Sequence, residues 1–208
     1  MAPVRSANVA LLCQTNNAFV TARETAQGVQ VAGGYAEFEG HQTWYRVLGD
    51  LDVGRADGPV PLVTLHGGPG ATHDYLLSMT DLARGGRAVV FYDQTGNGKS
   101  THFPDRGADF YTVGLFAREL DNLISHLGIS DRYHVLGQSW GGMLAQEHAI
   151  TPPPGLRSVI LSNTAASFAG FAAEANALRA ALPPEVEATL RRHEAAGHDR
   201  RPGVRRGV

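Results

Sequence analysis

The residues best suited to chemistry are a serine and its neighbouring glycines in HVLGQSWGG, residues 134–142. Ser139 lies between Gly137 and Gly141, after an apolar run typical of a strand and before a segment of helical composition. In a nucleophile elbow of the pattern Gly-x-Ser-x-Gly, a sharp turn exposes the serine hydroxyl above a helix N-terminus, which favours negative charge. The pattern predicts that Ser139 is a nucleophile and that a Cβ at either glycine would clash. An ordinary turn serine is the alternative, because the bare pattern also occurs by chance.

A second glycine-rich stretch, HGGPG at residues 66–70, follows another apolar run. Acyl transfer needs backbone N–H groups directed at the oxyanion, and glycine lets the chain come close to a substrate carbonyl. We expect the N–H of Gly68 or Gly67, together with that of Trp140 directly after the serine, to form an oxyanion hole. A plain glycine-rich turn is the alternative for HGGPG taken alone.

A third stretch, DQTGNGKS at residues 93–100, ends in Gly-Lys-Ser like a phosphate-binding loop. Such a loop needs a glycine five residues before Gly98, and Asp93 stands there instead. We therefore interpret this stretch as a turn that lines the site from a neighbouring strand.

Apolar runs and amphipathic segments alternate through the middle of the chain, which predicts an α/β fold with a mostly parallel sheet and flanking helices. A hairpin is expected at 35–50, strands at 61–70, 87–94, 133–138 and 156–163, and helices at 74–86, 111–128 and 141–150. From Phe168 the pattern changes to two helical stretches, 168–181 and 184–196, separated at Pro183. These stretches indicate the start of a separate helical subdomain.

The composition limits the classes of protein to which this chain can belong. The chain has 208 residues, of which 43% are hydrophobic, and this is enough for one sizeable domain. Its 18 basic and 20 acidic residues give a net charge of -2, so we expect neither nucleic acid nor a membrane surface as a partner. No apolar run approaches the roughly 18 residues of a membrane span. The single cysteine, Cys13, fits a reducing compartment, and we expect a cytoplasmic protein; a signal peptide at the N-terminus is the weaker alternative.

Three stretches, LHGGPGATHDYLL, VVFYDQTGNGKS and VLGQSWGGMLAQEHA, occur in this order and resemble the proline iminopeptidase family of α/β-hydrolases. The resemblance covers about residues 35–197 and implies an enzyme that releases N-terminal proline, or another N-terminal residue, by acyl-enzyme chemistry with no cofactor and no metal. Its partners would be short peptides or amino-acid amides with a free N-terminus. By this resemblance Ser139 is the nucleophile, and Gly67, Gly68 and Trp140 form the oxyanion hole.

The resemblance also divides the chain into parts. We expect an N-terminal segment at 1–32, an α/β-hydrolase core at 33–165, the beginning of a helical cap at 166–197 and an atypical tail at 198–208. The core would comprise only the N-terminal part of the fold, with the C-terminal strands of the sheet missing.

The partners of Ser139 in a catalytic triad are not found in this chain. An α/β-hydrolase triad runs Ser, then Asp or Glu, then His, yet the one aspartate after the serine is Asp199 and no histidine follows it. His148 lies nine residues into the helix after the elbow, about 13 Å along its axis, which predicts a helix-surface or packing role. His193 and His198 fall in or after the helical subdomain and would be unusual bases.

The last eleven residues, HDRRPGVRRGV, resemble nothing in the family. Arginine-, glycine- and proline-rich tails are typical of an arginine-rich coding region read out of frame. We therefore expect a chain truncated or frame-shifted near Gly197, which keeps the nucleophile and the oxyanion hole. Without a general base a serine hydroxyl is a poor nucleophile, so the chain as given is expected to be inactive.

Two other functions stay open. An esterase, lactonase or amino-acid amidase could use the same scaffold, because an elbow and an oxyanion loop do not distinguish an ester from an amide. A non-catalytic α/β-hydrolase-like binding protein is the alternative from another class. Haloalkane dehalogenase and epoxide hydrolase chemistry is disfavoured, because those reactions use an aspartate at the elbow where this chain has Ser139.

Overall fold

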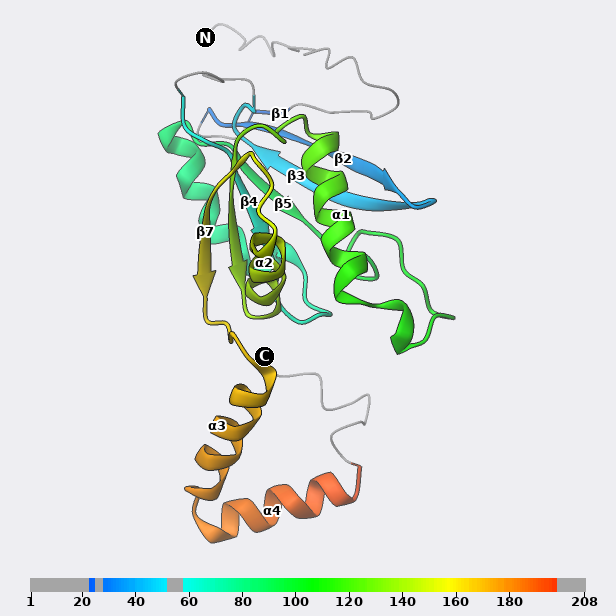
Figure 1. Cartoon of the computed structure of the whole chain (residues 1–208), viewed down its shortest axis with the longest axis vertical. Coiled ribbons are helices and arrows are strands. Elements are labelled where there is room, and N and C mark those ends of the chain that lie inside the picture. The colour runs from blue at the N-terminus through cyan, green and yellow to red at the C-terminus, as the bar shows by residue number, and fades with distance from the viewer. Residues whose placement is uncertain (1–22, 25–27, 52–57, 198–208) are drawn as a thin grey trace, which may run out of the picture. The chain divides into compact units, whose positions relative to one another are not determined.

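The computed structural model describes residues 23–24, 28–51 and 58–197, and Figure 1 shows their arrangement. The chain divides into two compact units, Met1–Thr164 and Ala165–Val208. Most of the expected N-terminal segment and the whole of the expected tail, 198–208, lie outside the described residues.

The first unit is built on a seven-stranded sheet in the order β1-β2-β3-β5-β4-β6-β7, counted over the described residues. The strands are β1 Arg23–Glu24, β2 Gln30–Phe38, β3 His41–Leu48, β4 Leu62–Leu65, β5 Val89–Tyr92, β6 Tyr133–Gln138 and β7 Leu156–Ser162. The four strands from β5 to β7 are parallel, whereas β1, β2 and β3 are antiparallel to their neighbours. The predicted hairpin is confirmed: Glu39 and Gly40 form its turn, both with positive φ.

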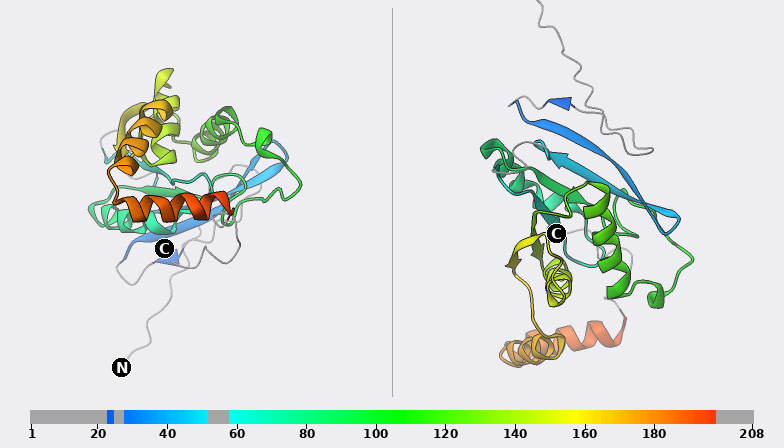
Figure 2. Two further views of the ribbon diagram at one scale, coloured as in Figure 1. Left: turned by 90° about the horizontal axis from the view of Figure 1, so that it is seen from below. Right: turned by 45° about the horizontal axis from the view of Figure 1, so that its top comes forward.

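Helices cover both faces of this sheet. Two α-helices, α1 Val113–His126 and α2 Trp140–Ile150, lie on one face, and η1 His73–Gly85 lies on the other (Figures 1 and 2). The helices predicted at 111–128 and 141–150 are therefore confirmed. The segment predicted at 74–86 is helical but of the 3-10 type, and it ends at Gly86, whose φ of 81° closes the last turn. A short 3-10 turn, η2 Ala108–Phe110, precedes α1.

Two hydrophobic clusters form on the two faces because side chains alternate along each strand. Val90 and Tyr92 of β5 pack with α1 and α2, whereas Val89 and Phe91 pack with Leu76 of η1. All four residues of β4 and of β5 are buried. This double coverage explains why both strands read as continuous apolar runs.

Strand β7 is different, because β6 is its only strand neighbour among the described residues. Ile160 and Leu161 are 42% and 49% exposed, and no residue of the strand is fully buried. The apolar run at 156–163 therefore forms the predicted strand, which lies at the edge of the described part of the sheet.

The second unit contains α3 Phe168–Ala180 and α4 Pro184–Ala195, which confirms the two predicted helical stretches. Ser167 caps α3 by accepting a hydrogen bond from the Gly170 N–H at 3.1 Å. Arg179 joins the helices through ion pairs to Glu187 at 2.7 Å and Glu194 at 2.8 Å. No helix of the described residues is long and apolar enough to cross a membrane.

Candidate active site

The turn between β6 and α2 holds Ser139 in a strained conformation, with φ 55° and ψ -119°. A positive φ is uncommon for a residue with a Cβ, so its surroundings must hold it there. The Ser139 N–H donates to the Ser162 carbonyl at 3.0 Å, and the Ser139 carbonyl accepts from the Thr164 hydroxyl at 2.7 Å. The backbone around the serine is thus anchored to the end of β7 and the residues after it.

The glycines of the elbow are required by close approach of the backbone. A Cβ on Gly137 would lie 2.1 Å from the Gly141 carbonyl oxygen, and one on Gly141 would lie 2.1 Å from the Leu65 carbonyl oxygen. Both predicted clashes are therefore confirmed. A third glycine, Gly142, is equally restricted, because its Cβ would come within 2.5 Å of the Thr164 side chain.

The HGGPG loop lies directly against the elbow. A Cβ on Gly67 would be 3.0 Å from the Ser139 Cβ and 2.9 Å from the Gln138 Oε1. The Gly67 N–H donates to the Tyr75 hydroxyl at 2.5 Å, so this expected oxyanion donor is already paired. Among the described residues, the N–H groups of Gly68 and Trp140 donate to no protein acceptor. Trp140 is the first residue of α2, where backbone N–H groups have no partner within the helix.

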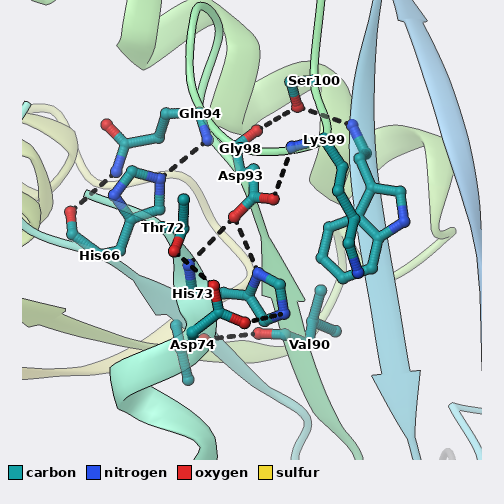
Figure 3. A network of polar contacts seen from close by, with 12 residues as sticks. His66, Thr72, His73, Asp74, Val90, Asp93, Gln94, Gly98, Lys99 and Ser100 are labelled. Atoms are coloured by element: carbon teal, nitrogen blue, oxygen red, sulfur yellow. Dashed lines mark hydrogen bonds and ion pairs between the residues drawn. The ribbon is translucent and has the colours of Figure 1, made fainter. Parts of the chain in front are cut away.

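His66 holds this loop through hydrogen bonds of its ring (Figure 3). Its Nδ1 donates to the Gly67 carbonyl at 2.9 Å, and its Nε2 accepts from the Gln94 N–H at 2.9 Å. The Gln94 side chain in turn donates to the His66 carbonyl at 2.8 Å and accepts from the Trp140 indole at 2.9 Å. This network requires a neutral imidazole, and burial lowers the His66 pKa in agreement with it.

The DQTGNGKS stretch folds around its own aspartate (Figure 3). The Asp93 carboxylate accepts from the His73 backbone N–H at 3.0 Å, the His73 Nδ1 at 2.8 Å and the Lys99 N–H at 2.9 Å. A Cβ on Gly98 would lie 2.2 Å from Asp93 Oδ2, which explains that glycine. The Lys99 ammonium lies 4.3 Å from the centre of the Trp44 ring. The Lys99 N–H binds this internal carboxylate where a phosphate loop would bind a ligand.

A second buried carboxylate, that of Glu119 in α1, holds the same stretch through hydrogen bonds. It accepts hydrogen bonds from the Thr43 hydroxyl at 2.5 Å, the Thr95 hydroxyl at 2.6 Å and the Thr95 N–H at 2.9 Å. Burial raises the Glu119 pKa, and these hydrogen bonds oppose that shift. Sequence reasoning missed Glu119 and the His73–Asp93 pair, because neither belongs to a local motif; the position of Asp93 directly after a strand was the available signal.

Within the described residues, no imidazole or carboxylate is hydrogen-bonded to the Ser139 side chain. The buried His148 pairs with the Tyr133 hydroxyl at 2.8 Å and with Asp121 at 3.4 Å, so of the two predicted roles the structure shows packing. His193 lies on α4 in the second unit, and the predicted tail with His198 and Asp199 is outside the described residues. In the described part of the chain, no group of three or more His, Cys, Asp or Glu side chains could hold a metal ion.

A sequence model of the alpha/beta hydrolase fold family matches residues 60–203. The chain belongs to this family. It is 38% identical over 172 residues to the proline iminopeptidase of Lactobacillus helveticus strain DPC 4571, covering 82% of this chain and 56% of that one. Among solved structures, VinJ is 52% identical with a TM-score of 0.77, and proline iminopeptidase from Mycobacterium smegmatis is 44% identical with a TM-score of 0.70.

Both structures match 82% of this chain and 56% of their own length. The chain therefore spans little more than half the length of the relatives it matches. The similarity to proline iminopeptidases agrees with the resemblance found in the sequence, and the predicted α/β-hydrolase fold is confirmed.

Proposed function

We propose that this chain carries the nucleophile part of a serine hydrolase that releases N-terminal proline, or another N-terminal residue, from short peptides. The observation that carries the proposal is the juxtaposition of a strained Ser139 with the Gly67–Gly68 turn and the first N–H of α2. Its supporting observation is the similarity to proline iminopeptidases of two bacteria. We also propose a cytoplasmic location, with no nucleic-acid or membrane partner.

The proposed reaction begins with attack of the Ser139 hydroxyl oxygen on the carbonyl carbon of the N-terminal residue. The negative charge that develops on the carbonyl oxygen would accept hydrogen bonds from the N–H groups of Gly68 and Trp140. The shortened peptide leaves as an amine, and water then hydrolyses the acyl-enzyme. Removal of the serine proton needs a general base, which the described residues do not supply. The 208 residues alone should therefore react orders of magnitude more slowly than a complete site.

A chimera tests the proposal. Residues 1–197 would be joined to the part of the Mycobacterium smegmatis enzyme that lies beyond the matched region, and hydrolysis of prolyl 4-nitroanilide would be followed by absorbance. We expect the chimera to hydrolyse the anilide and the 208-residue chain to be essentially inactive. Ser139→Ala in the chimera should abolish activity while leaving its circular dichroism and elution volume unchanged.

A chimera that folds but shows no hydrolysis would overturn the proposal and leave a binding protein as the better interpretation. The same chimera separates the enzymatic alternatives, because prolyl anilide, other aminoacyl amides and simple esters can be compared at equal concentration. A preference for simple esters would contradict the peptidase assignment and favour an esterase.

A further inference from the structure

Tyr75 of η1 makes a contact that links the two halves of the site. Its hydroxyl accepts the Gly67 N–H at 2.5 Å and donates to the Gln138 Oε1 at 2.7 Å. Gly67 follows β4, and Gln138 is the last residue of β6, directly before Ser139. One hydroxyl thus joins the HGGPG loop to the elbow. Tyr75 is 48% exposed, so packing in the core does not explain the position of its side chain.

The same hydroxyl lies beside the serine. The point where a Cβ on Gly67 would lie is 3.0 Å from the Tyr75 hydroxyl, 3.0 Å from the Ser139 Cβ and 2.9 Å from the Gln138 Oε1. These three groups therefore surround one side of Gly67. A substrate carbonyl attacked by Ser139 would approach the same region.

The hydrogen bonds of Gly67 decide the direction of the next N–H. His66 Nδ1 holds the Gly67 carbonyl, while Tyr75 holds the Gly67 N–H, so both peptide groups of Gly67 are fixed. The Gly67 carbonyl and the Gly68 N–H belong to one planar peptide group and point in opposite directions. Because the carbonyl points to the His66 ring, the Gly68 N–H points away from it.

We propose that Tyr75 is a positioning residue of this site. Its hydroxyl accepts the hydrogen bond of the Gly67 N–H and holds the turn, so that the Gly68 and Trp140 N–H groups remain available to the oxyanion. This inference rests on the proposed function. Tyr75 acts through the loop and not as a donor to the oxyanion, because its own proton is bound by Gln138. Gln138 therefore contributes to the same positioning, because its side-chain oxygen is the acceptor that orients the Tyr75 hydroxyl.

The test measures binding of prolylboronic acid to the full 208-residue chain by calorimetry. The Ser139 oxygen adds to boron and its proton passes to solvent, which gives a tetrahedral, negatively charged adduct that resembles the acyl-transfer intermediate. We expect Tyr75→Phe to weaken binding about 10-fold, the size of one net hydrogen bond. Tyr35→Phe, which changes an exposed tyrosine of β2, is the matched control and should bind like the native chain.

A second variant separates positioning from direct contact. Gln138→Met removes the acceptor and should weaken binding about as much as Tyr75→Phe, and the double variant should lose no more than either single one. If Gln138→Met binds like the native chain while Tyr75→Phe is weakened, the hydroxyl acts directly on the adduct and the positioning role is wrong.

Two further outcomes would also overturn the inference. If Tyr75→Phe binds like the native chain while Ser139→Ala is weakened, only the role of Tyr75 fails. If Ser139→Ala binds prolylboronic acid as tightly as the native chain, the proposed function fails and the role of Tyr75 fails with it. Thermal unfolding of each variant, followed by tryptophan fluorescence, shows whether a loss of binding comes from loss of structure.

Discussion

The elbow of the first unit and the helices of the second unit differ in the space around their glycines. At Gly137, Gly141 and Gly142, an added Cβ would come within 2.1–2.5 Å of neighbouring atoms. At Gly170 of α3 the nearest atom would be 3.6 Å away, which is ordinary van der Waals contact. The elbow therefore depends on the absence of side chains, because strand, helix and loop must meet around one serine. The helices of the second unit place no such demand on Gly170.

The two regions also hold their charges differently. In the first unit, Asp93 and Glu119 are buried and each accepts several hydrogen bonds. In the second unit, Arg179 pairs with two glutamates on helices that contain no buried residue. A buried charge is costly unless it is well paired, whereas an exposed pair contributes little. Substitutions in the first region should accordingly have much larger effects.

The largest effect is expected for Gly141→Ala. The new Cβ would lie 2.1 Å from the Leu65 carbonyl oxygen, in a backbone that cannot yield without separating β4 from α2. We expect a loss of more than about 4 kcal/mol in the free energy of unfolding, measured by urea and tryptophan fluorescence. Gly170→Ala in α3 is the control, and it should stabilise its helix by about 0.5–1 kcal/mol in circular dichroism. Equal effects of the two substitutions would contradict the comparison.

Much of the first unit could be predicted from the sequence, because the residues that define its motifs are adjacent in the chain. The strand, Gly-x-Ser-x-Gly and helix around Ser139 are contiguous, and so is the HGGPG loop after β4. His66, which holds this loop, is adjacent in the chain to its glycines. Hydrophobic periodicity placed every main helix and strand of the parallel part of the sheet.

The contacts that support the site could not be predicted, because they join residues far apart in the chain. Glu119 binds Thr43 across 76 positions, and Tyr75 binds Gln138 across 63. A single sequence contains no signal for such pairs before the sheet order is known. Periodicity likewise shows that β7 is apolar, but it does not show how many neighbours cover the strand.

A smaller loss than that of Gly141→Ala is expected for Glu119→Ala. The substitution leaves the Thr43 hydroxyl and the Thr95 N–H and hydroxyl without their buried acceptor. Because unpaired buried donors are costly, the free energy of unfolding should fall by about 3 kcal/mol in urea denaturation. Glu174→Ala, at an exposed position of α3, should change it by less than about 0.5 kcal/mol. A loss below about 1 kcal/mol for Glu119→Ala would mean that these hydrogen bonds do not stabilise the fold.

The smallest effect is expected for His66→Gln, and it sharpens the comparison most. The substitution should change how the stability of the first unit depends on pH. Burial lowers the folded-state pKa of His66 below its ordinary value of 6.5, so the folded state binds fewer protons than the unfolded state. The stability from neutral His66 is present above pH 6.5 and is lost as the pH falls through the folded-state pKa. A protonated His66 can no longer accept the Gln94 N–H, so the loop loses this link to Gln94, whereas the Nδ1–H still donates to the Gly67 carbonyl.

Glutamine does not titrate, so His66→Gln should show a shallower loss of stability between pH 8 and pH 5, with a difference of at most about 1.4 kcal/mol per pH unit. Urea denaturation followed by tryptophan fluorescence measures this slope, because both tryptophans, Trp44 and Trp140, lie in the first unit. His102→Gln, the same substitution at an exposed position, is the matched control. If His66→Gln keeps the native slope, the acid sensitivity of the first unit does not come from His66, and its neutral imidazole is not what holds the oxyanion loop to Gln94.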